Sequence, residues 1–329
     1  MLLSGIRNHQ VEPINKWEGS RILMSLSLKR KLRYALFRQM WNIGLIHKSV
    51  EIVAGLEGSV LQRQALNELL WMPEHRGYFK ADPFVTFSQF NDQELLVFYE
   101  RFDWQTNIGR IDCVPVTGGR FGEPVLSLNS PYHLSYPYVY CDADHEFYIP
   151  EHAEARDVSR YDFNIKGEAI AKKTMLPRTA LVDSTLIKHN NRFWIFATHP
   201  GPFVNSDLHL YYADDLLGPW HSHKLNPVKS SLNGSRPAGQ PFSFKGRIFR
   251  PAQNCSNYYG ENIVINKITK LSDEEFSEIP ETHIYPPSGS QYDYGLHTIS
   301  HVEGCTVIDG ARLESKLHRV FDRLSLFFS

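Results

Sequence analysis

From Tyr78 onward, short apolar runs alternate with polar turns in a pattern that occurs five times. Each unit consists of a strand-like run, a polar turn and a second run with large side chains. The five turns are Asn91–Asp92, Asp142–His145, Asn190–Asn191, Lys245–Gly246 and Glu303–Gly304. Because Asn, Asp and Gly tolerate the positive φ angles of tight hairpins, the pattern predicts five antiparallel hairpins in an all-β fold.

The residues that head these units recur at a nearly regular interval. They are Asp82, Tyr136, Asp183, Arg236 and His297, separated by 54, 47, 53 and 61 residues. Five units of about fifty residues each indicate radial repetition, as in a five-bladed β-propeller. A two-sheet sandwich also contains many hairpins, but it does not need to repeat one pattern five times. In a propeller the first strand of each blade lines the channel, so we expect these five side chains to meet there.

The N-terminal region differs in composition from the repeats. It is rich in Leu, Arg, Lys and Gln, and it contains helix-like segments near 28–41 and 59–70. We therefore expect three parts: a partly helical extension over 1–74, the propeller over 75–315 and a C-terminal tail over 316–329. In segment 28–41 the apolar residues recur at helical spacing beside a cationic face. Such a helix either packs on the domain or makes a peripheral contact with an anionic membrane surface.

Composition and charge narrow the partners and the compartment. The net charge is −1, so the chain lacks the basic excess that is typical of proteins that bind a nucleic-acid polymer. The four cysteines are far apart and form no CxxC pair, which favours buried free thiols in a reducing compartment. Residues 1–20 contain no continuous apolar run of a secretory signal. We expect a cytoplasmic protein, peripheral to the inner face of the membrane where segment 28–41 contacts lipid.

Several motifs resemble those of known carbohydrate-active propellers. The run 77-GYFKADPFV-85 resembles the first-blade strand of glycoside hydrolase family 43, where an Asp-Pro pair supplies the catalytic base. The run 294-YGLHTIS-300 resembles a last-blade segment of the same family, whose histidine points into the channel near a calcium or water site. This resemblance implies a divalent cation near His297, and we expect no other cofactor.

A closer resemblance, over residues 75–310, is to the N-terminal propeller domain of plant glucosamine inositolphosphorylceramide transferases and its bacterial relatives. Most of the likeness lies in residues 180–231, followed by 235-SRPAGQPF-242, 250-RPAQNCSNYYG-260 and 306-TVIDG-310. In the plant proteins glycosyl transfer is assigned to a different, C-terminal domain. The resemblance therefore implies the fold more directly than the activity.

Transfer or cleavage of a glycosidic bond generally uses two carboxyl groups, one as the proton donor and one as the base or nucleophile. Asp82, before Pro83, is the candidate base or nucleophile, and its structural alternative is to cap a turn. Asp183 is a second candidate carboxylate at the start of a strand. Glu151 is a candidate general acid, because apolar neighbours would raise its pKa. The alternative for Glu151 is a surface position after Pro150.

Seven further residues are candidates for substrate binding: Arg236, His297, His199, Asp207, His209, Arg250 and Gln253. Arg236 is always charged and cannot act as a general acid, but it can bind a carboxylate or phosphate with two nitrogens, which favours an anionic sugar or a sugar phosphate. His199, Asp207 and His209 either bind a metal or serve as hydrogen-bonded loop residues. Arg250 and Gln253 either bind sugar hydroxyls or brace the fourth blade.

Taken together, these features favour a carbohydrate-active enzyme that acts on a glycosidic bond, by transfer or hydrolysis, in cytoplasmic synthesis of a surface polysaccharide or glycolipid. Its partners would be a sugar or glycolipid substrate and a sugar nucleotide. The alternative is a non-catalytic sugar-binding propeller that assists a separate glycosyltransferase. That alternative explains why the chain lacks the third-blade glutamate of family 43. A protein-interaction propeller would have shorter and stricter repeats.

Overall fold

The computed structural model of the chain describes residues 33, 35–88 and 91–316. By its contacts the chain divides into two compact units, one of which is Gln39–Leu313. This unit contains the sheets and the candidate site. The predicted tail over 316–329 lies outside the described residues except for Lys316.

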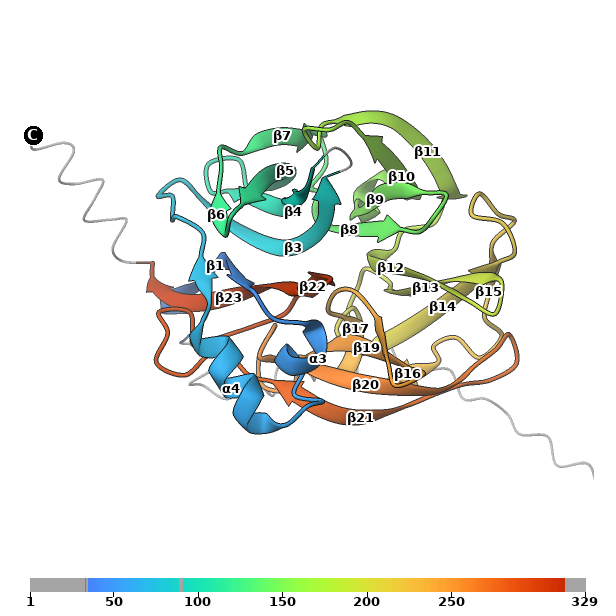
Figure 1. Ribbon diagram of the computed structural model, residues 1–329. Helices are drawn as coiled ribbons and strands as arrows, with labels where there is room; N and C mark the ends of the chain where they lie inside the picture. Colours follow the sequence, from blue (N-terminus) through green and yellow to red (C-terminus); the bar gives the residue numbers. More distant parts are fainter. Residues whose placement is uncertain (1–32, 34, 89–90, 317–329) are drawn as a thin grey trace, which may run out of the picture. The chain divides into compact units, whose positions relative to one another are not determined.

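The described residues form five antiparallel sheets around a common axis (Figure 1), which confirms the predicted five-bladed β-propeller. Blade 1 contains β3 (Tyr78–Ser88), β4 (Asn91–Asp103), β5 (Ile108–Thr117), β6 (Arg120–Phe121) and β7 (Val125–Leu128). Blade 2 contains β8 (Ser135–Cys141), β9 (Glu146–Glu151), β10 (Asp157–Phe163) and β11 (Ala169–Pro177), with the 3-10 turn η1 (Ala153–Ala155). Blade 3 contains β12 (Val182–His189), β13 (Arg192–Thr198), β14 (Asp207–Ala213), β15 (His221–Ser222) and β16 (Lys229–Ser230).

Blade 4 contains β17 (Asn233–Pro237), β18 (Phe242–Phe244), β19 (Arg247–Asn254), β20 (Asn262–Leu271) and β21 (Phe276–Ile284).

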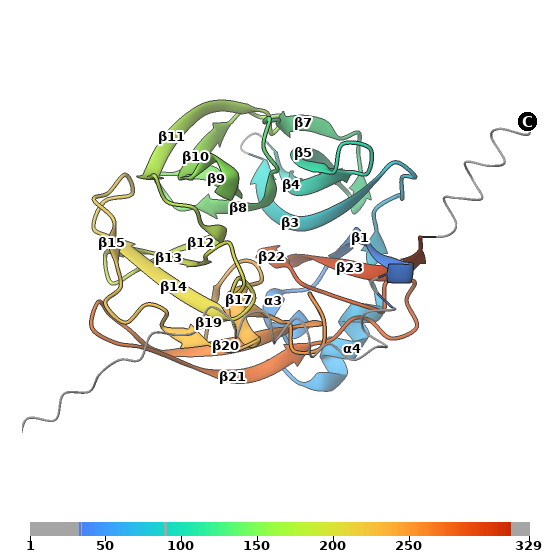
Figure 2. The same cartoon turned by 180° about the vertical axis from the view of Figure 1, so that it is seen from behind.

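The last blade combines strands from both ends of the unit. Blade 5 contains β22 (Ile299–Val302), β23 (Cys305–Ser315), β1 (Phe37–Ile46) and β2 (Leu70–Trp71), in the order β2-β1-β23-β22. Figure 2 shows β1 and β23 side by side from behind. Pairing the two ends of the chain closes the ring and protects strand edges that would otherwise be free.

This closure corrects two sequence predictions. The helix predicted over 28–41 is wrong for its last five residues, because Phe37 to Trp41 begin β1. Residues 40–46 are all buried, and a continuous buried run has no period that separates a strand from a helix. Residues 28–32 and 34 lie outside the described residues. The boundary predicted at residue 75 also moves, since β1 and β2 precede it and yet belong to the last blade.

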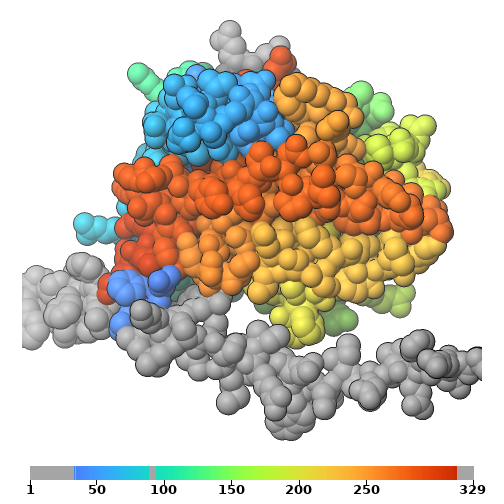
Figure 3. All heavy atoms as spheres, turned by 90° about the horizontal axis from the view of Figure 1, so that it is seen from below, coloured from blue at the N-terminus to red at the C-terminus, as the bar shows by residue number. Residues whose placement is uncertain are grey.

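The second helical prediction, near residues 59–70, is confirmed by α4 (Ser59–Asn67), which follows the short α3 (Val50–Val53) between β1 and β2. Ala65 and Leu66 are the buried residues of α4. Gln62 Nε2 donates a hydrogen bond to the carbonyl oxygen of His283 in β21 at 3.0 Å. Figure 3 shows the two helices, in blue, against the orange-red surface of β21. The helical segment thus covers the junction of blades 4 and 5.

A bulge recurs near the start of the inner strands and determines where the candidate acids point. In β3, β8 and β12 the pairing register shifts at Asp82, Tyr136 and Asp183. These three residues have φ angles of 53°, 45° and 55°, in the left-handed region that residues with a side chain seldom adopt. A bulge re-aims the side chain of the extra residue. The same local feature therefore directs one side chain from each of three blades towards the axis.

Aromatic side chains pack the blades against one another. The ring of Phe98 in blade 1 lies 5.1 Å from Tyr148 and 4.7 Å from Phe163, both in blade 2. All three belong to one buried cluster that extends through blades 1, 2 and 3. Aromatic pairs at these separations are favourable beyond the area that they bury. This packing holds the inner strands in fixed positions around the channel.

Candidate functional site

The five residues predicted to line the channel come together at one end of the inner strands. The backbone N–H of Tyr136 donates to Asp82 Oδ2 at 3.3 Å, and His297 Nδ1 lies 3.8 Å from Asp82 Oδ1. Arg236 Nε donates to Asp183 Oδ2 at 2.6 Å. The charge of Asp183 contributes to the raised pKa of Asp82, so the two groups also interact electrostatically. Residues from all five blades therefore form one polar centre.

Asp82 is held by neighbours from two other blades. The residue is 6% exposed. Thr298 Oγ1 donates to Oδ1 at 2.6 Å, and Tyr136 N–H donates to Oδ2. Burial raises the pKa of Asp82 to about 6; the positive charge of His297 opposes this effect, whereas Asp183 adds to it. The acid in this apolar strand is thus paired with donors from other blades, and it does not cap a local turn.

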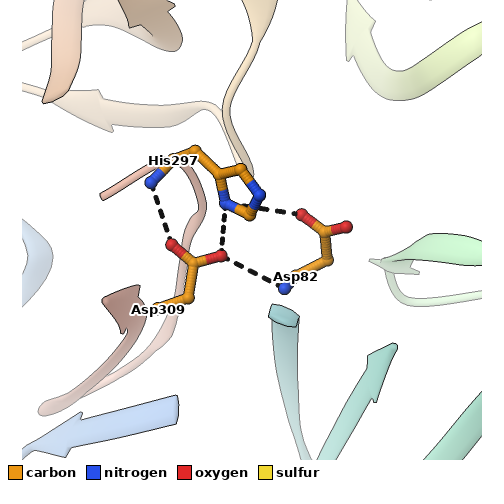
Figure 4. Close-up of side chains that lie close together, drawn as sticks. All are labelled: Asp82, His297 and Asp309. Atoms are coloured by element: carbon orange, nitrogen blue, oxygen red, sulfur yellow. Dashed lines mark hydrogen bonds and ion pairs between the residues drawn. The ribbon is translucent and has the colours of Figure 1, made fainter. Parts of the chain in front are cut away.

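His297 and Asp309 form a bracket beside Asp82 (Figure 4). Asp309 is fully buried, and its Oδ2 lies 2.5 Å from His297 Nδ1. Asp309 Oδ1 accepts the N–H groups of His297 at 2.9 Å and Thr298 at 3.0 Å, while Oδ2 also accepts the N–H of Asp82 at 3.2 Å. Burial alone would lower the pKa of His297, but the carboxylates of Asp309 and Asp82 outweigh it and raise the pKa. The bracket joins the last blade to the first.

Asp183 and Arg236 form a second charged group, between blades 3 and 4. Asp183 is 3% exposed, and its Oδ2 also accepts a hydrogen bond from Gln253 Nε2 at 3.4 Å. Arg236 Nη1 donates to Asn205 Oδ1 at 2.9 Å, and its guanidinium lies 5.0 Å from the centre of the Tyr259 ring. The guanidinium neutralises the buried carboxylate, as a buried charge requires. Gln253, a predicted substrate ligand, instead supports this pair.

Glu151 lies at the end of β9, where blade 2 meets the polar centre. It is partly exposed, unlike Asp82 and Asp183. Ser135 Oγ donates to Glu151 Oε2 at 3.0 Å, and the N–H of Ala153 donates to Oε1 at 2.8 Å. Burial raises the pKa of Glu151 to about 7; the Ala153 amide lowers it, and the charge of Asp183 raises it further. Of the three predicted acids, Glu151 is therefore the one that reaches the surface and holds a proton near neutral pH.

The sequence predictions missed several members of this centre. Glu100, in β4 opposite Ala81, is buried, and burial raises its pKa well above the ordinary value, with further contributions from Asp82 and Glu151. The sequence feature that could have indicated Glu100 is that it is the single acid inside the apolar run 95-LLVFYERF-102. Asp309, in 306-TVIDG-310, gave a similar signal.

An aromatic wall, also missed, consists of Trp41 and Tyr259. The Trp41 ring stacks on the His297 ring with centroids 3.9 Å apart and an interplanar angle of 11°. Tyr259 meets His297 edge-on at 5.2 Å. No pattern near Trp41 could have indicated this contact, because β1 reaches the centre only after the ring has closed. The N-terminal strand thus supplies part of the site.

Arg250 does not lie where a substrate could contact it. It is fully buried in β19. Its Nε donates to Glu278 Oε2 at 2.8 Å and its Nη2 to Glu278 Oε1 at 2.6 Å, while Nη2 also donates to the carbonyl of Gly234 at 2.7 Å. Lys229 Nζ donates to the same glutamate at 2.8 Å. Of the two alternatives for Arg250, the structure favours bracing of the fourth blade, and its assignment to substrate is corrected accordingly.

His199, Asp207 and His209 lie on or beside the second and third strands of blade 3, and not on its inner strand. His199 follows β13, whereas Asp207 and His209 are in β14. The two histidine rings meet edge-on with centroids 4.3 Å apart, and His199 Nε2 is hydrogen-bonded to Tyr211 OH at 2.9 Å. The ligand atoms of the three predicted residues do not all come within 4.8 Å of one another. This arrangement favours hydrogen-bonded polar residues over a metal site.

The cation predicted near His297 can be tested against the donors present. One nitrogen of His297 and carboxylate oxygens of Asp82 and Asp309 lie within 4.8 Å of one another, and all three residues are buried. Imidazole and carboxylate are suitable ligands for a divalent metal. Both oxygens of Asp309, however, already accept backbone N–H groups, and Oδ2 is paired with His297. The residues therefore fit an internal ion pair better than a ligand set, and the cation stays a prediction.

Comparisons with known proteins agree with this architecture. Residues 72–292 match the family described as glucosamine inositolphosphorylceramide transferase 1, N-terminal. The chain is 32% identical over 260 residues to glucosamine inositolphosphorylceramide transferase 1 of Oryza sativa subsp. japonica, covering 73% of this chain and 34% of the relative. It is 29% identical over 262 residues to the protein of that name from Arabidopsis thaliana, again covering 34% of the relative. The chain therefore spans about a third of the length of the curated relatives that it matches.

Solved structures support the fold alone. An exo-β-1,3-galactanase from Clostridium thermocellum superimposes with a TM-score of 0.50 at 15% sequence identity, over 63% of this chain and 50% of that chain. This likeness supports the propeller fold, and at such identity it says nothing of activity. The match over residues 72–292 covers more than half of the chain, and the chain belongs to the glucosamine inositolphosphorylceramide transferase 1, N-terminal, family.

Proposed function

We propose that this protein acts on a glycosidic bond, by transfer or hydrolysis, during synthesis of a glycolipid. One observation carries the proposal: carboxyl groups from three blades lie close enough at one end of the channel to interact, since burial and the charge of Asp183 raise the pKa of both Asp82 and Glu151. The pKa is about 6 for Asp82 and about 7 for Glu151. Glycosidic chemistry generally uses two carboxyl groups, of which one donates a proton and the other acts as the base or nucleophile.

The proposed mechanism gives each acid a separate part. Near neutral pH, Glu151 is partly protonated and partly exposed, so it would donate a proton to the leaving oxygen of the glycosidic bond. Asp82 is mostly ionised at that pH, so it would accept the proton of the attacking hydroxyl or water. Asp183 would keep the positive charge of Arg236 balanced and hold its guanidinium in position to orient the substrate.

The substrate class follows from the family and from Arg236. The rice relative is named glucosamine inositolphosphorylceramide transferase 1, which supports a glycolipid as a partner, and we further propose a sugar nucleotide as the donor. Arg236 uses Nε for Asp183 and Nη1 for Asn205. Among the described residues its Nη2 donates no further hydrogen bond, and it remains for a phosphate or hydroxyl oxygen of the substrate.

The proposed location is the cytoplasm, beside the inner face of a membrane. The basic segment 28–41 motivates this part of the proposal, with its last residues now in β1. Within the described residues, no helix has the length and apolar character needed to cross a bilayer. Flotation of the protein with vesicles that contain anionic lipid tests the location. Binding that is lost when Lys29, Arg30 and Lys31 are replaced by glutamine supports it, and equal recovery with neutral vesicles counts against it.

A second candidate function is a non-catalytic propeller that binds sugar and assists a separate glycosyltransferase. Asp82 and Asp183 favour it, because both are nearly inaccessible and both already accept hydrogen bonds from protein groups. Buried and fully bonded acids are typical of structural positions.

One set of variants distinguishes these functions. Asp82→Asn, Asp183→Asn and Glu151→Gln remove the charges with little change of shape, and Glu154→Gln is the matched control, since Glu154 is exposed three residues away. Each variant would replace the protein in its source cell, and the extracted glycolipids would be compared by mass spectrometry. Catalysis predicts that Glu151→Gln and Asp82→Asn abolish one product while sugar binding by the purified proteins persists. An unchanged product with all three variants folded and binding would leave only the non-catalytic function.

A further inference from the structure

Glu100 is a buried acid of the candidate site to which the proposed mechanism gives no part. It lies in β4 opposite Ala81, the residue before Asp82, and it is 6% exposed. Burial raises its pKa well above the ordinary value, and the charges of Asp82 and Glu151 raise it further, so the carboxyl lies within electrostatic range of both proposed catalytic groups. A fourth carboxyl group therefore belongs to the end of the channel that holds Asp82, Asp183 and Glu151.

Residues 133–136, which lead into β8, contact three of these acids. The contacts are His133 Nε2 with Glu100 Oε1 at 3.5 Å, Ser135 Oγ with Glu151 Oε2 at 3.0 Å, and Tyr136 N–H with Asp82 Oδ2 at 3.3 Å. Because four consecutive residues span at most about 14 Å even when fully extended, the three acids lie around one small volume. Glu100 is therefore beside the other two acids in space, although it belongs to the second strand of its blade.

Among the described residues, no positive partner holds Glu100 in its ionised form. His133 Nδ1 accepts the N–H of Gly109 at 3.0 Å, so the proton of a neutral imidazole lies on Nε2. Burial lowers the pKa of His133, which keeps that imidazole neutral near pH 7. Glu100 makes no ion pair with a lysine or arginine of the described chain. A buried carboxyl without a counter-charge keeps its proton, and the neutral group then offers one O–H donor.

The donor of this neutral carboxyl is unused, and it is accessible. Neither oxygen of Glu100 takes part in a hydrogen bond within the described chain, since the 3.5 Å separation from His133 is longer than such bonds normally are. The side-chain atoms that are both buried and unbonded do not include either oxygen, and 8% of the side chain is exposed, so the carboxyl retains contact with solvent. Gly109 leaves the space that the carboxyl occupies, because a Cβ there would lie 2.5 Å from Oε1. The unused donor is therefore open to a ligand atom.

We propose that Glu100 binds the sugar of the substrate by donating a hydrogen bond from its neutral carboxyl group to a sugar oxygen. This role rests on the proposed function, because it needs a carbohydrate in the same site. It differs from the role of Glu151, since Glu100 keeps its proton whereas Glu151 gives its proton to the leaving oxygen. A buried donor without a partner lowers stability, and a substrate oxygen supplies the missing partner. A sugar that lacks an oxygen at this position leaves the donor unbonded, so Glu100 also selects among sugars.

Stability measurements show whether Glu100 is instead a structural residue. Glu100→Met removes the carboxyl and keeps an unbranched side chain. Because no internal hydrogen bond is lost, the urea midpoint of the purified full chain should stay at the wild-type value or rise. Glu123→Met is the matched control, since Glu123 is exposed in the same blade. A midpoint far below those of the wild type and the control would assign Glu100 to the fold and overturn the proposal.

Substrate binding is tested by replacing the protein in its source cell and measuring the extracted glycolipids by mass spectrometry. We expect Glu100→Met to lower the product several-fold, and Glu100→Gln, whose amide N–H can replace the donor, to restore a large part of it. Glu123→Met should leave the product unchanged. Loss of product with Asp82→Asn and Glu151→Gln but not with Glu100→Met would overturn this role and leave the proposed function intact, whereas an unchanged product with all of these variants would end both. Equal loss with Glu100→Gln and Glu100→Met would also overturn the role, because the charge or a transferred proton would then be what the site requires.

Discussion

Asp309 Oδ2 lies 2.5 Å from His297 Nδ1, and the same carboxylate accepts three backbone N–H groups, from Asp82, His297 and Thr298. Asp82 is in blade 1, whereas the other residues belong to blade 5. One buried carboxylate therefore connects the first blade of the ring to the last. This connection adds to the strand pairing of β1 with β23, and it places the bulge of β3 directly beside the imidazole of His297.

The first prediction concerns this carboxylate. Replacing Asp309 by alanine removes all four hydrogen-bond acceptor contacts and leaves His297 without its closest counter-charge, so we expect a loss of about 3–5 kcal/mol in the free energy of unfolding. Denaturant unfolding measures the loss. Asp293→Ala is the control, since Asp293 is exposed and should change the free energy by less than about 0.5 kcal/mol. Similar stabilities of the two variants would contradict the proposed bracket.

The second prediction concerns the ion pair of Arg236 and Asp183. Arg236→Met leaves Asp183 buried without its guanidinium, so the variant should lose about 3–5 kcal/mol of unfolding free energy. The double variant Arg236→Met with Asp183→Asn removes both charges and should recover part of that loss. A double-mutant cycle measures the coupling. Additive effects of the two single changes would show that the 2.6 Å contact has no energetic consequence.

The third prediction concerns Arg250, which the sequence offered as a sugar ligand or as a brace. Because its guanidinium is fully buried and bonded to both oxygens of Glu278, Arg250→Met should destabilise the protein by about 3–5 kcal/mol. Arg247→Met, on the same strand and exposed, should have little effect. If Arg250→Met instead kept full stability and weakened sugar binding, the assignment to substrate would be restored.

The sequence was sufficient for the repeat and for the residues that head it, because turn chemistry and hairpin spacing are local properties. It was insufficient for β1, since Met40 to Ile46 are buried on both faces and show neither a strand nor a helix period. It also missed the contacts of Asp309 with Asp82 and of Trp41 with His297, which form only when the ring closes. Arg250 shows why the role of an arginine is hard to predict from sequence. An arginine can bind substrate or a buried glutamate, and only its burial in the folded protein distinguishes the two roles.

The last prediction concerns pH and Glu151. The pKa of this carboxyl is about 7 in the folded protein, compared with an ordinary value of 4.5. Between these values the folded protein binds more protons than the unfolded chain, so the free energy of unfolding must fall as pH rises through this window. The raised pKa values of Asp82 and His297 also make the free energy of unfolding fall as pH rises. The contribution of Glu151 is therefore isolated by comparison with a variant. In Glu151→Gln the contribution of this one group is absent.

We therefore expect the wild-type protein to lose stability relative to Glu151→Gln as pH rises from 4.5 through 7, and this relative loss should level off about one pH unit above the folded-state pKa. Glutamine has one acceptor oxygen where Glu151 uses two, for Ser135 and Ala153, and losing one acceptor shifts the stability of the variant at every pH without altering this slope. Unfolding in urea at a series of pH values measures the difference. Glu154→Gln should instead follow the wild-type profile, because Glu154 is exposed. Parallel profiles of wild type and Glu151→Gln would mean that Glu151 ionises as an ordinary surface acid, and its proposed part as proton donor would then have no physical basis.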